Sequence, residues 1–275
     1  MRLALVVVAA AGCHVYDPLD DIQFREYADT QTAVHAILDE VPAPRVYAVG
    51  EYHMTRKTTA QASPLARFSR EIIGLLAPHA HHLVVEAWLD DGCRRGDVTR
   101  QVAAATDRAP ATATDLQALV VASRRLAFDT RGLPMTCIEY GAMLDPKGRV
   151  DFLRLLELVT DKLGETTRAA LAADPDRAVI VYGGALHNDL YPNWPLAELS
   201  YAAPLAQELG GHVLEIDLVV PEVVAGMPLV RHEPWFPLLS RAAPERVMVW
   251  ERGPSSYVVI LPAQQAALAG PISLM

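Results

Sequence analysis

The chain has 275 residues, of which 51% are hydrophobic and 21% are charged, and its formal net charge at pH 7 is -9. This size and composition are typical of one large globular domain. The acidic balance and the dispersed Lys and Arg residues argue against a nucleic-acid partner, because phosphate binding needs a basic face.

The first 13 residues resemble a bacterial lipoprotein signal. Arg2 precedes nine apolar residues, 3–11, which are too few to span a bilayer but suit the hydrophobic region of a signal peptide. The run ends in Ala-Ala-Gly-Cys, and small residues directly before a cysteine are typical of a lipobox. A buried first strand of a cytosolic domain is the alternative. We expect residues 1–13 to be the signal, Cys13 to be lipidated and 14–28 to be a tether to a membrane of the cell envelope.

The first half of the remaining chain alternates helical and strand patterns. Apolar residues at helical spacing predict helices over residues 31–40, 65–76, 97–105 and 115–128. Short apolar runs predict strands over residues 45–50, 83–86 and 134–140. The first of these runs is apolar on both faces, as in a buried parallel strand.

The second half continues this alternation and then changes. Helices are predicted over residues 151–173 and 196–209, and strands over residues 177–182 and 212–220. Residues 246–250 and 257–261 predict a hairpin. The sequence therefore predicts a single α/β domain, residues 29–275, with a mainly parallel central sheet, helices on both faces and a C-terminal hairpin.

Polar side chains follow four of the predicted strands. Residues 50–53 read Gly-Glu-Tyr-His, Glu86 and Glu139 each end an apolar run, and residues 183–187 read Gly-Gly-Ala-Leu-His. Because the carboxyl ends of parallel strands meet at one edge of a sheet, we expect these side chains to share a cleft. Carboxylates and imidazoles in one cleft suit a divalent-metal site or general acid–base catalysis.

Each motif taken alone has a structural explanation as well. Glu51 and His53 face the same side of a continuing strand, but Glu51 can cap the next element and His53 can be solvated. Glu86 follows three buried residues and needs water, a partner or a metal. Glu139 is expected to be an outer partner of the cleft, and His187 can pack at the start of a helix.

The combined motifs resemble the superfamily of erythromycin esterase, ChaN and Tiki proteins. The matching residues lie between about 45 and 187, and they are Gly50, Glu51, His53, Glu86, Gly183, Gly184 and His187. The resemblance implies an α/β core with these Glu and His residues in a cleft. Members include metal-dependent proteases, esterases that use a water activated by Glu and His, and haem-binding lipoproteins. Residues 54–57 hold none of the extra histidines that ChaN-like members often carry after the first motif.

Three functions fit this resemblance. The first is an envelope lipoprotein that hydrolyses an ester or amide bond of a small-molecule or peptide substrate. The expected catalytic residues are Glu51, His53, Glu86 and His187. A carboxylate would be the general base, because an attacking water must lose a proton, and His187 would hold or protonate the leaving group. Of the four, Glu51, His53 and His187 are the expected ligands of a divalent metal whose identity the oxygen and nitrogen donors leave open.

The second function is a haem- or ligand-binding lipoprotein. Tyr52, His53 or His187 would then be an axial ligand to iron, and Gly183 and Gly184 would line the cofactor loop. The third is a scaffold that keeps the fold without catalysis. The chain has no Gly-x-Ser-x-Gly elbow, no Gly-x-Gly-x-x-Gly and no Walker loop, which argues against a serine nucleophile and a nucleotide cofactor.

Two further cysteines, Cys93 and Cys137, leave their pairing open. In an oxidising compartment they can form a disulfide, and two separate buried thiols fit the sequence equally well. The chain contains no Cys-x-x-Cys, so a structural zinc cluster is not expected.

The lipobox predicts that Cys13→Ser moves the protein from the membrane fraction to the soluble fraction of the cell. Stable anchoring needs two membrane signals, such as two acyl chains, and the substitution removes the acylated thiol. Fractionation with mass spectrometry of the mature N-terminus measures this. A wild-type protein that begins at Met1 and is soluble would show that no signal is present.

Overall fold

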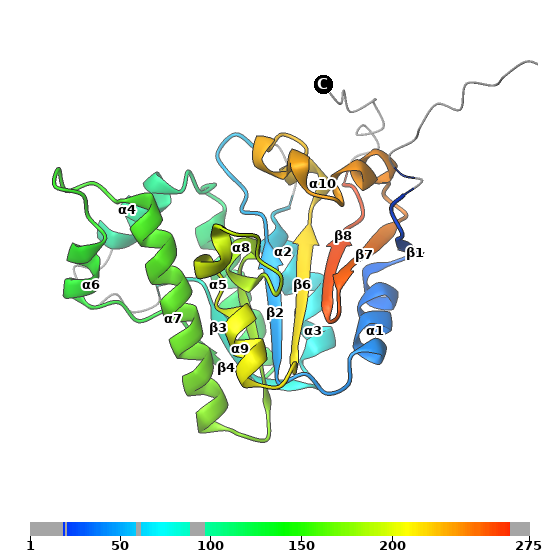
Figure 1. Cartoon of the computed structure of the whole chain (residues 1–275), viewed down its shortest axis with the longest axis horizontal. Coiled ribbons are helices and arrows are strands. Elements are labelled where there is room, and N and C mark those ends of the chain that lie inside the picture. Colours follow the sequence, from blue (N-terminus) through cyan, green and yellow to red (C-terminus); the bar gives the residue numbers. More distant parts are fainter. Residues whose placement is uncertain (1–18, 20, 59–61, 89–96, 265–275) are drawn as a thin grey trace, which may run out of the picture.

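The structure, a computed structural model, describes residues 19, 21–58, 62–88 and 97–264, with only the backbone described for 97–100. Eight strands form one sheet in the order β1-β7-β8-β6-β2-β5-β3-β4 (Figure 1). In chain order they are β1 (Arg25–Tyr27), β2 (Val46–Glu51), β3 (Ala80–Val85), β4 (Asp129–Arg131), β5 (Ala178–Gly184), β6 (Val213–Val219), β7 (Val247–Gly253) and β8 (Ser256–Ile260). The pairs from β8 through β6, β2, β5 and β3 to β4 are parallel, and β7 is antiparallel to both β8 and β1.

Helices cover both faces of this sheet. One face is packed by α1 (Thr30–Glu40), α2 (Pro64–Arg67), the π-helical turn η1 (Phe68–Ile72), α3 (Ile73–Leu76), α5 (Thr112–Arg125) and α10 (Pro221–Val224). The other face is packed by α7 (Phe152–Ala173) and α9 (Ala202–Glu208). The remaining helical segments are α4 (Asp97–Ala105), α6 (Cys137–Ala142), α8 (Ala185–Asn188), η2 (Leu196–Leu199), η3 (Pro228–His232) and η4 (Phe236–Arg241).

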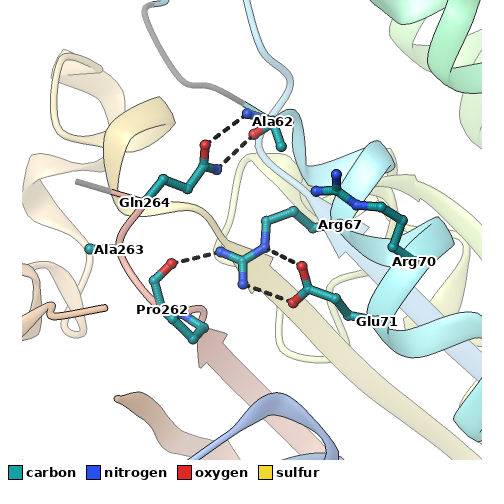
Figure 2. Close-up of a pocket in the computed structure, with 7 residues that line it drawn as sticks. All are labelled: Ala62, Arg67, Arg70, Glu71, Pro262, Ala263 and Gln264. Atoms are coloured by element: carbon teal, nitrogen blue, oxygen red, sulfur yellow. Dashed lines mark hydrogen bonds and ion pairs between the residues drawn. The ribbon is translucent and has the colours of Figure 1, made fainter. Parts of the chain in front are cut away.

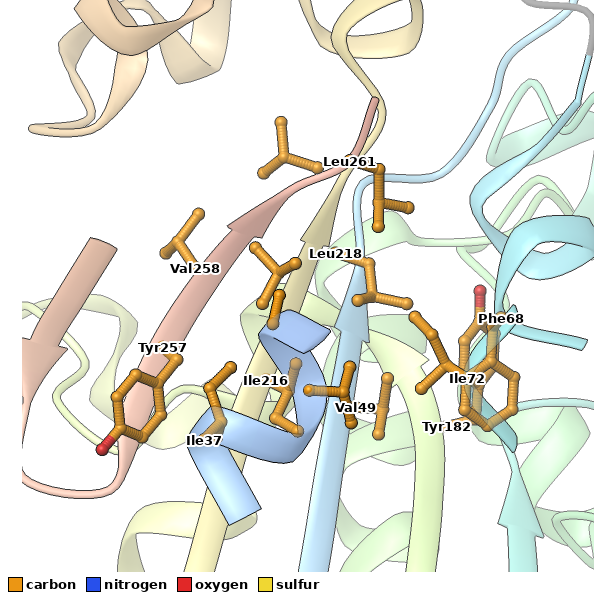
Figure 3. Packing of buried hydrophobic residues seen from close by; sticks show 14 of the residues in the cluster. Ile37, Val49, Phe68, Ile72, Tyr182, Ile216, Leu218, Tyr257, Val258 and Leu261 are labelled. Carbon is orange, nitrogen blue, oxygen red and sulfur yellow. The ribbon is translucent and has the colours of Figure 1, made fainter. Parts of the chain in front are cut away.

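Strand β2 lies at the centre of the sheet and is buried along its whole length. Its side chains alternate between the two layers: Tyr47 and Val49 pack with the first helical face, and Val46 and Ala48 with the second. Figure 3 shows Val49 among the apolar side chains of the first face. Burying one such aliphatic side chain stabilises the fold by about 1.5–3 kcal/mol. The packing on both faces therefore holds β2, including its C-terminal end, in one place.

The predicted α/β fold, with a mainly parallel sheet and a C-terminal hairpin, is confirmed. One predicted strand is wrong: where residues 134–140 were expected to form a strand, residues 137–142 form α6, and the additional strand is β4, which ends at Arg131. A capping box explains the difference, because the Thr136 hydroxyl accepts a hydrogen bond from the Glu139 amide while the Glu139 carboxylate accepts one from the Thr136 amide. A short apolar run such as 135–138 fits either state, and this cap decides for the helix.

Two smaller differences concern segment ends. The helix predicted over 196–209 is broken into η2 and α9, with the Ser200 hydroxyl capping the Ala203 amide at 3.1 Å. Residues 25–27, which were placed in the tether, form the edge strand β1 beside β7. The expected signal, residues 1–13, lies outside the described residues. Within the described part of the chain, no helix is long and apolar enough to cross a bilayer.

Candidate functional site

The parallel register brings the predicted motifs to one edge of the sheet. Gly50 pairs with Gly183 and Glu51 with Gly184, because β2 and β5 end together. Glu86 directly follows β3, the other neighbour of β5, and its amide donates to the Tyr182 carbonyl at 2.8 Å. Helix α8 begins one residue after β5, so it stands on the same edge.

Glu51 and His53 form a direct pair. His53 Nδ1 lies 2.6 Å from Glu51 Oε1, and the Tyr182 hydroxyl donates to Glu51 Oε2. Both carboxylate oxygens are therefore engaged, and only 6% of Glu51 is exposed. The His53 side chain is 27% exposed, so solvent reaches the ring and hardly reaches the carboxylate behind it.

Glu86 closes the site from the β3 side. Its Oε2 accepts a hydrogen bond of 2.5 Å from the Gly184 amide, and its Oε1 lies 3.5 Å from His53 Nε2. A Cβ added to Gly183 would lie 3.0 Å from Glu86 Oε2, and one added to Gly184 would lie 3.0 Å from His53 Nε2. The side chains of Glu86 and His53 thus lie over the two glycines, and larger residues at positions 183 and 184 would displace them.

Arg108 joins these residues and was not predicted from the sequence. Its Nη2 donates to His53 Nε2 at 2.7 Å and to Glu86 Oε1 at 3.0 Å, and its Nη1 lies 3.4 Å from Glu51 Oε1. The residue sits between α4 and α5, in a segment that pairs with the chain after His53. There the Ala109 amide donates to the Met54 carbonyl at 3.1 Å. No motif marks Arg108, since its partners lie at least 22 residues away along the chain.

His187 faces the same edge from α8. Its Cδ2 would lie 3.5 Å from a Cβ at Gly184, and only 3% of the residue is exposed. Nδ1 lies 3.1 Å from the Leu199 carbonyl and 2.8 Å from Thr160 Oγ1. Because a carbonyl only accepts, Nδ1 carries the ring proton in its bond to Leu199, and Nε2 is an acceptor in the neutral ring.

The charges of the site shift the pKa of its two carboxyl groups in one direction. Burial alone raises the pKa of Glu51, but the hydrogen bond and charge of His53, together with Arg108, outweigh it and hold that pKa below its ordinary value. The same balance of burial, His53 and Arg108 holds the pKa of Glu86 far below its ordinary value. Both carboxylates are therefore ionised at neutral pH.

The two imidazoles shift in opposite directions. For His53, burial and Arg108 lower the pKa, but Glu86 and Glu51 outweigh them, so the pKa lies above its ordinary value. For His187, burial dominates and lowers the pKa. His187 is thus neutral at pH 7, whereas His53 retains its proton to a higher pH than a free imidazole.

The residues do not fit the expected divalent-metal site. The Arg108 guanidinium contacts both His53 Nε2 and Glu86 Oε1, the atoms that would face a cation, and its fixed positive charge opposes a second one. No three His, Cys, Asp or Glu side chains in the described ranges are placed to hold a metal ion.

The geometry also gives no support to the cofactor role expected of Tyr52. Its ring packs against Trp235, with 5.5 Å between ring centroids, while the next residue, His53, turns to Glu51. Glu139, the expected outer partner, is engaged elsewhere: besides capping α6, it forms an ion pair of 2.5 Å with Lys162. The capping box that makes 137–142 a helix is the reason Glu139 does not end a strand at this edge.

A surface pocket lies away from these residues. It is lined by Ala62, Arg67, Arg70, Glu71, Pro262, Ala263 and Gln264. Figure 2 shows the Gln264 amide bonded to both the N–H and the carbonyl of Ala62, at 2.8 and 3.0 Å. Arg67 is bonded to Glu71 and to the Pro262 carbonyl. These contacts tie the segment after β8 to the start of α2, and we assign no ligand to the pocket.

Comparison with known proteins does not assign the chain to a family. No protein-family model and no curated protein matches it. Among solved structures, the type III effector HopBA1 aligns with a TM-score of 0.45 and 14% identity, over 89% of this chain and 98% of that chain. A mutant of erythromycin esterase EreC in its open conformation aligns with a TM-score of 0.45 and 11% identity, over 88% and 96%. FtsY from Elizabethkingia anophelis reaches a TM-score of 0.30 and 16% identity, over 70% and 47%.

Gly50→Ala should destabilise the protein. The new methyl group would clash with Asp217 Oδ1 and lie 2.9 Å from Ala185 Cα, so we expect a loss of about 1–3 kcal/mol in the free energy of unfolding. Gly74→Ala is the matched control, because nothing lies within 4 Å of its added Cβ. Urea denaturation of both variants measures the effect. Equal stability of the two would show that β2 and α8 are not closely packed.

Proposed function

We propose that the protein is a hydrolase that cleaves an ester or amide bond with a water activated by His53. The observation that carries this proposal is the Glu51–His53 pair of 2.6 Å, which fixes the proton on Nδ1 and leaves Nε2 as the base. Nε2 lies 2.7 Å from Arg108 Nη2 and 3.5 Å from Glu86 Oε1, and the His53 side chain is 27% exposed. The resemblance in sequence motifs to esterases with a water activated by Glu and His agrees with this chemistry.

Glu51 is better suited to orient His53 than to be the base itself. Both of its oxygens already accept hydrogen bonds, and its lowered pKa makes it a weak proton acceptor. The raised pKa of His53 makes that ring the stronger acceptor. This replaces the sequence-based interpretation in which a carboxylate removes the proton.

In the proposed reaction, His53 Nε2 takes one proton from water as the water oxygen attacks the carbonyl carbon. Glu51 and Glu86 stabilise the imidazolium that forms, and Arg108 shifts its donor from Nε2 to the oxyanion of the tetrahedral intermediate. His53 then returns the proton to the leaving oxygen or nitrogen as that bond breaks. Neutral His187 accepts a hydrogen bond at Nε2, which suits holding the water or an N–H or O–H of the substrate.

We also propose that the protein works in the cell envelope as a lipid-anchored enzyme. Besides the lipobox-like start, Cys137 is disulfide-bonded, and the other two cysteines, Cys13 and Cys93, lie outside the described residues. Disulfides persist in oxidising compartments such as the periplasm. The substrate would be a small-molecule ester or a peptide that reaches this compartment.

His53→Gln should lower the turnover number by about 10²–10⁴-fold, because the general base is lost. A panel of nitrophenyl esters and fluorogenic peptides, followed with wild type and variant, measures the loss. His79→Gln is the control, since this exposed histidine precedes β3 at the opposite end of the strand. Undiminished activity of His53→Gln would remove His53 from the reaction. Tight haem binding by a wild type that cleaves none of these substrates would favour the binding-protein function.

The rate should rise with pH as His53 loses its proton, with a midpoint above 6.5. The sign follows from the requirement for an unprotonated Nε2 and from the raised pKa of His53. Glu86→Gln should move this midpoint to lower pH, because the carboxylate that stabilises the imidazolium is gone. The pH profile of kcat/KM measures both. A midpoint that Glu86→Gln leaves unchanged would mean that another group titrates.

A further inference from the structure

A second buried charge cluster lies beside the helix that carries His187. Arg252 of β7 contacts three carboxylates: Nη1 lies 2.9 Å from Asp189 Oδ1 and 3.1 Å from Glu215 Oε1, and Nη2 lies 3.2 Å from Asp217 Oδ2. Glu215 and Asp217 are 0% and 1% exposed, and the Arg252 side chain is 16% exposed. One cation therefore contacts three acidic groups, of which Glu215 and Asp217 are almost fully buried and Asp189 is 22% exposed.

This cluster holds the residues directly after His187. Asp189 ends α8, two residues after the histidine. The next amide, that of Leu190, donates to Glu215 Oε2 at 3.0 Å, and the Ser256 hydroxyl donates to the same oxygen at 2.6 Å. Arg252 thus connects the end of α8 to β6 and β7, and Glu215 connects it to β8.

The tip of the hairpin makes a second attachment to this segment. The Tyr191 hydroxyl donates to the Pro254 carbonyl at 2.8 Å, and a Cβ added to Gly253 would lie 3.0 Å from the Tyr191 ring. The glycine lets the ring lie directly on the backbone beside Arg252. Both attachments therefore come from three consecutive residues of the hairpin, 252–254.

Helix α8 needs such contacts because it is too short to be stable by its own hydrogen bonds. It has four residues, Ala185–Asn188, and a helix of one turn gains little from its own hydrogen bonds. Asn188 is 0% exposed, and neither Nδ2 nor Oδ1 has a hydrogen-bond partner among the described residues. Burying an unpaired amide costs free energy, so contacts outside the helix must keep it in place.

We propose that Arg252 is a positioning residue for His187. Its bond to Asp189 fixes the end of α8, and the helix then presents the His187 ring with Nδ1 on the Leu199 carbonyl and Cδ2 toward Gly184. The effect on the rate of hydrolysis rests on the proposed function. The effect on the position of the proton in the His187 ring does not rest on the proposed function, and it is measured separately.

Arg252→Gln tests the proposal, with Arg252→Lys as the conservative variant. Arg246→Gln is the matched control, because Arg246 stands just before β7 and pairs only with Glu26, at 2.8 Å, among the described residues. The readout is the nitrogen-15 spectrum of the histidine rings, with the His187 signals assigned from His187→Gln. We expect Arg252→Gln to shift the population of His187 away from the form protonated at Nδ1. Lysine should restore it in part, and Arg246→Gln should leave it unchanged.

The turnover number of Arg252→Gln should fall by about 10–100-fold with little change in KM, because a small displacement of a catalytic group has this effect. If Arg252→Gln does not fold, Asp189→Ala removes the carboxylate that joins Arg252 to the end of α8 and leaves Glu215 and Asp217 paired with Arg252. A lower melting temperature with an unchanged His187 spectrum in both variants would overturn the positioning role. A shifted spectrum together with full activity of His187→Gln would keep the positioning role and remove His187 from the proposed reaction.

Discussion

The positive charge of Arg108 helps to keep two largely buried carboxylates of the site ionised. Two carboxylates, Glu51 and Glu86, lie in a place that solvent barely reaches, and burial there disfavours their ionised forms. Arg108 contacts both, and with His53 it more than offsets that cost. The same guanidinium contacts His53 Nε2, so in the proposed reaction the group that helps His53 keep the carboxylates ionised would also donate to the oxyanion.

The sheet could be predicted from sequence because its strands are buried on both faces. A run such as 45–50 has few alternatives, and the end of the run marks the edge where Glu51 stands. The edges of the sheet are less readable. Strand β4 reads Asp-Thr-Arg and β1 reads Arg-Glu-Tyr, so neither shows an apolar pattern, and both depend on pairing with a longer neighbour. The strand predicted over residues 134–140 is wrong for the opposite reason: an apolar run is present there, but the Thr136 cap makes the segment start a helix.

Within the site, the residues at the ends of strands could be predicted from the sequence. The site residues that lie away from the strand ends could not be predicted. Glu51, Glu86 and His187 follow strands whose parallel register is implied by the alternation of elements. Arg108 stands in a turn between two helices and reaches the site through backbone pairing with residues 54–56. Thr160 is similarly hidden, because it lies inside a long helix whose pattern reports only packing. Long-range contacts of single polar residues leave no periodic signal.

The two carboxyl clusters give the stability of the fold opposite dependences on pH. No hydrogen bond among the described residues joins the Arg108 set to the Arg252 set. The pKa of Glu51 and Glu86 is lowered on folding, so their contribution is present above the unfolded value and is lost as pH falls. Burial, with the charge of Glu215, raises the pKa of Asp217, so its contribution is largest in acid and is lost as pH rises. The edge of one sheet therefore carries two opposed titrations, which move the pH of greatest stability in opposite directions.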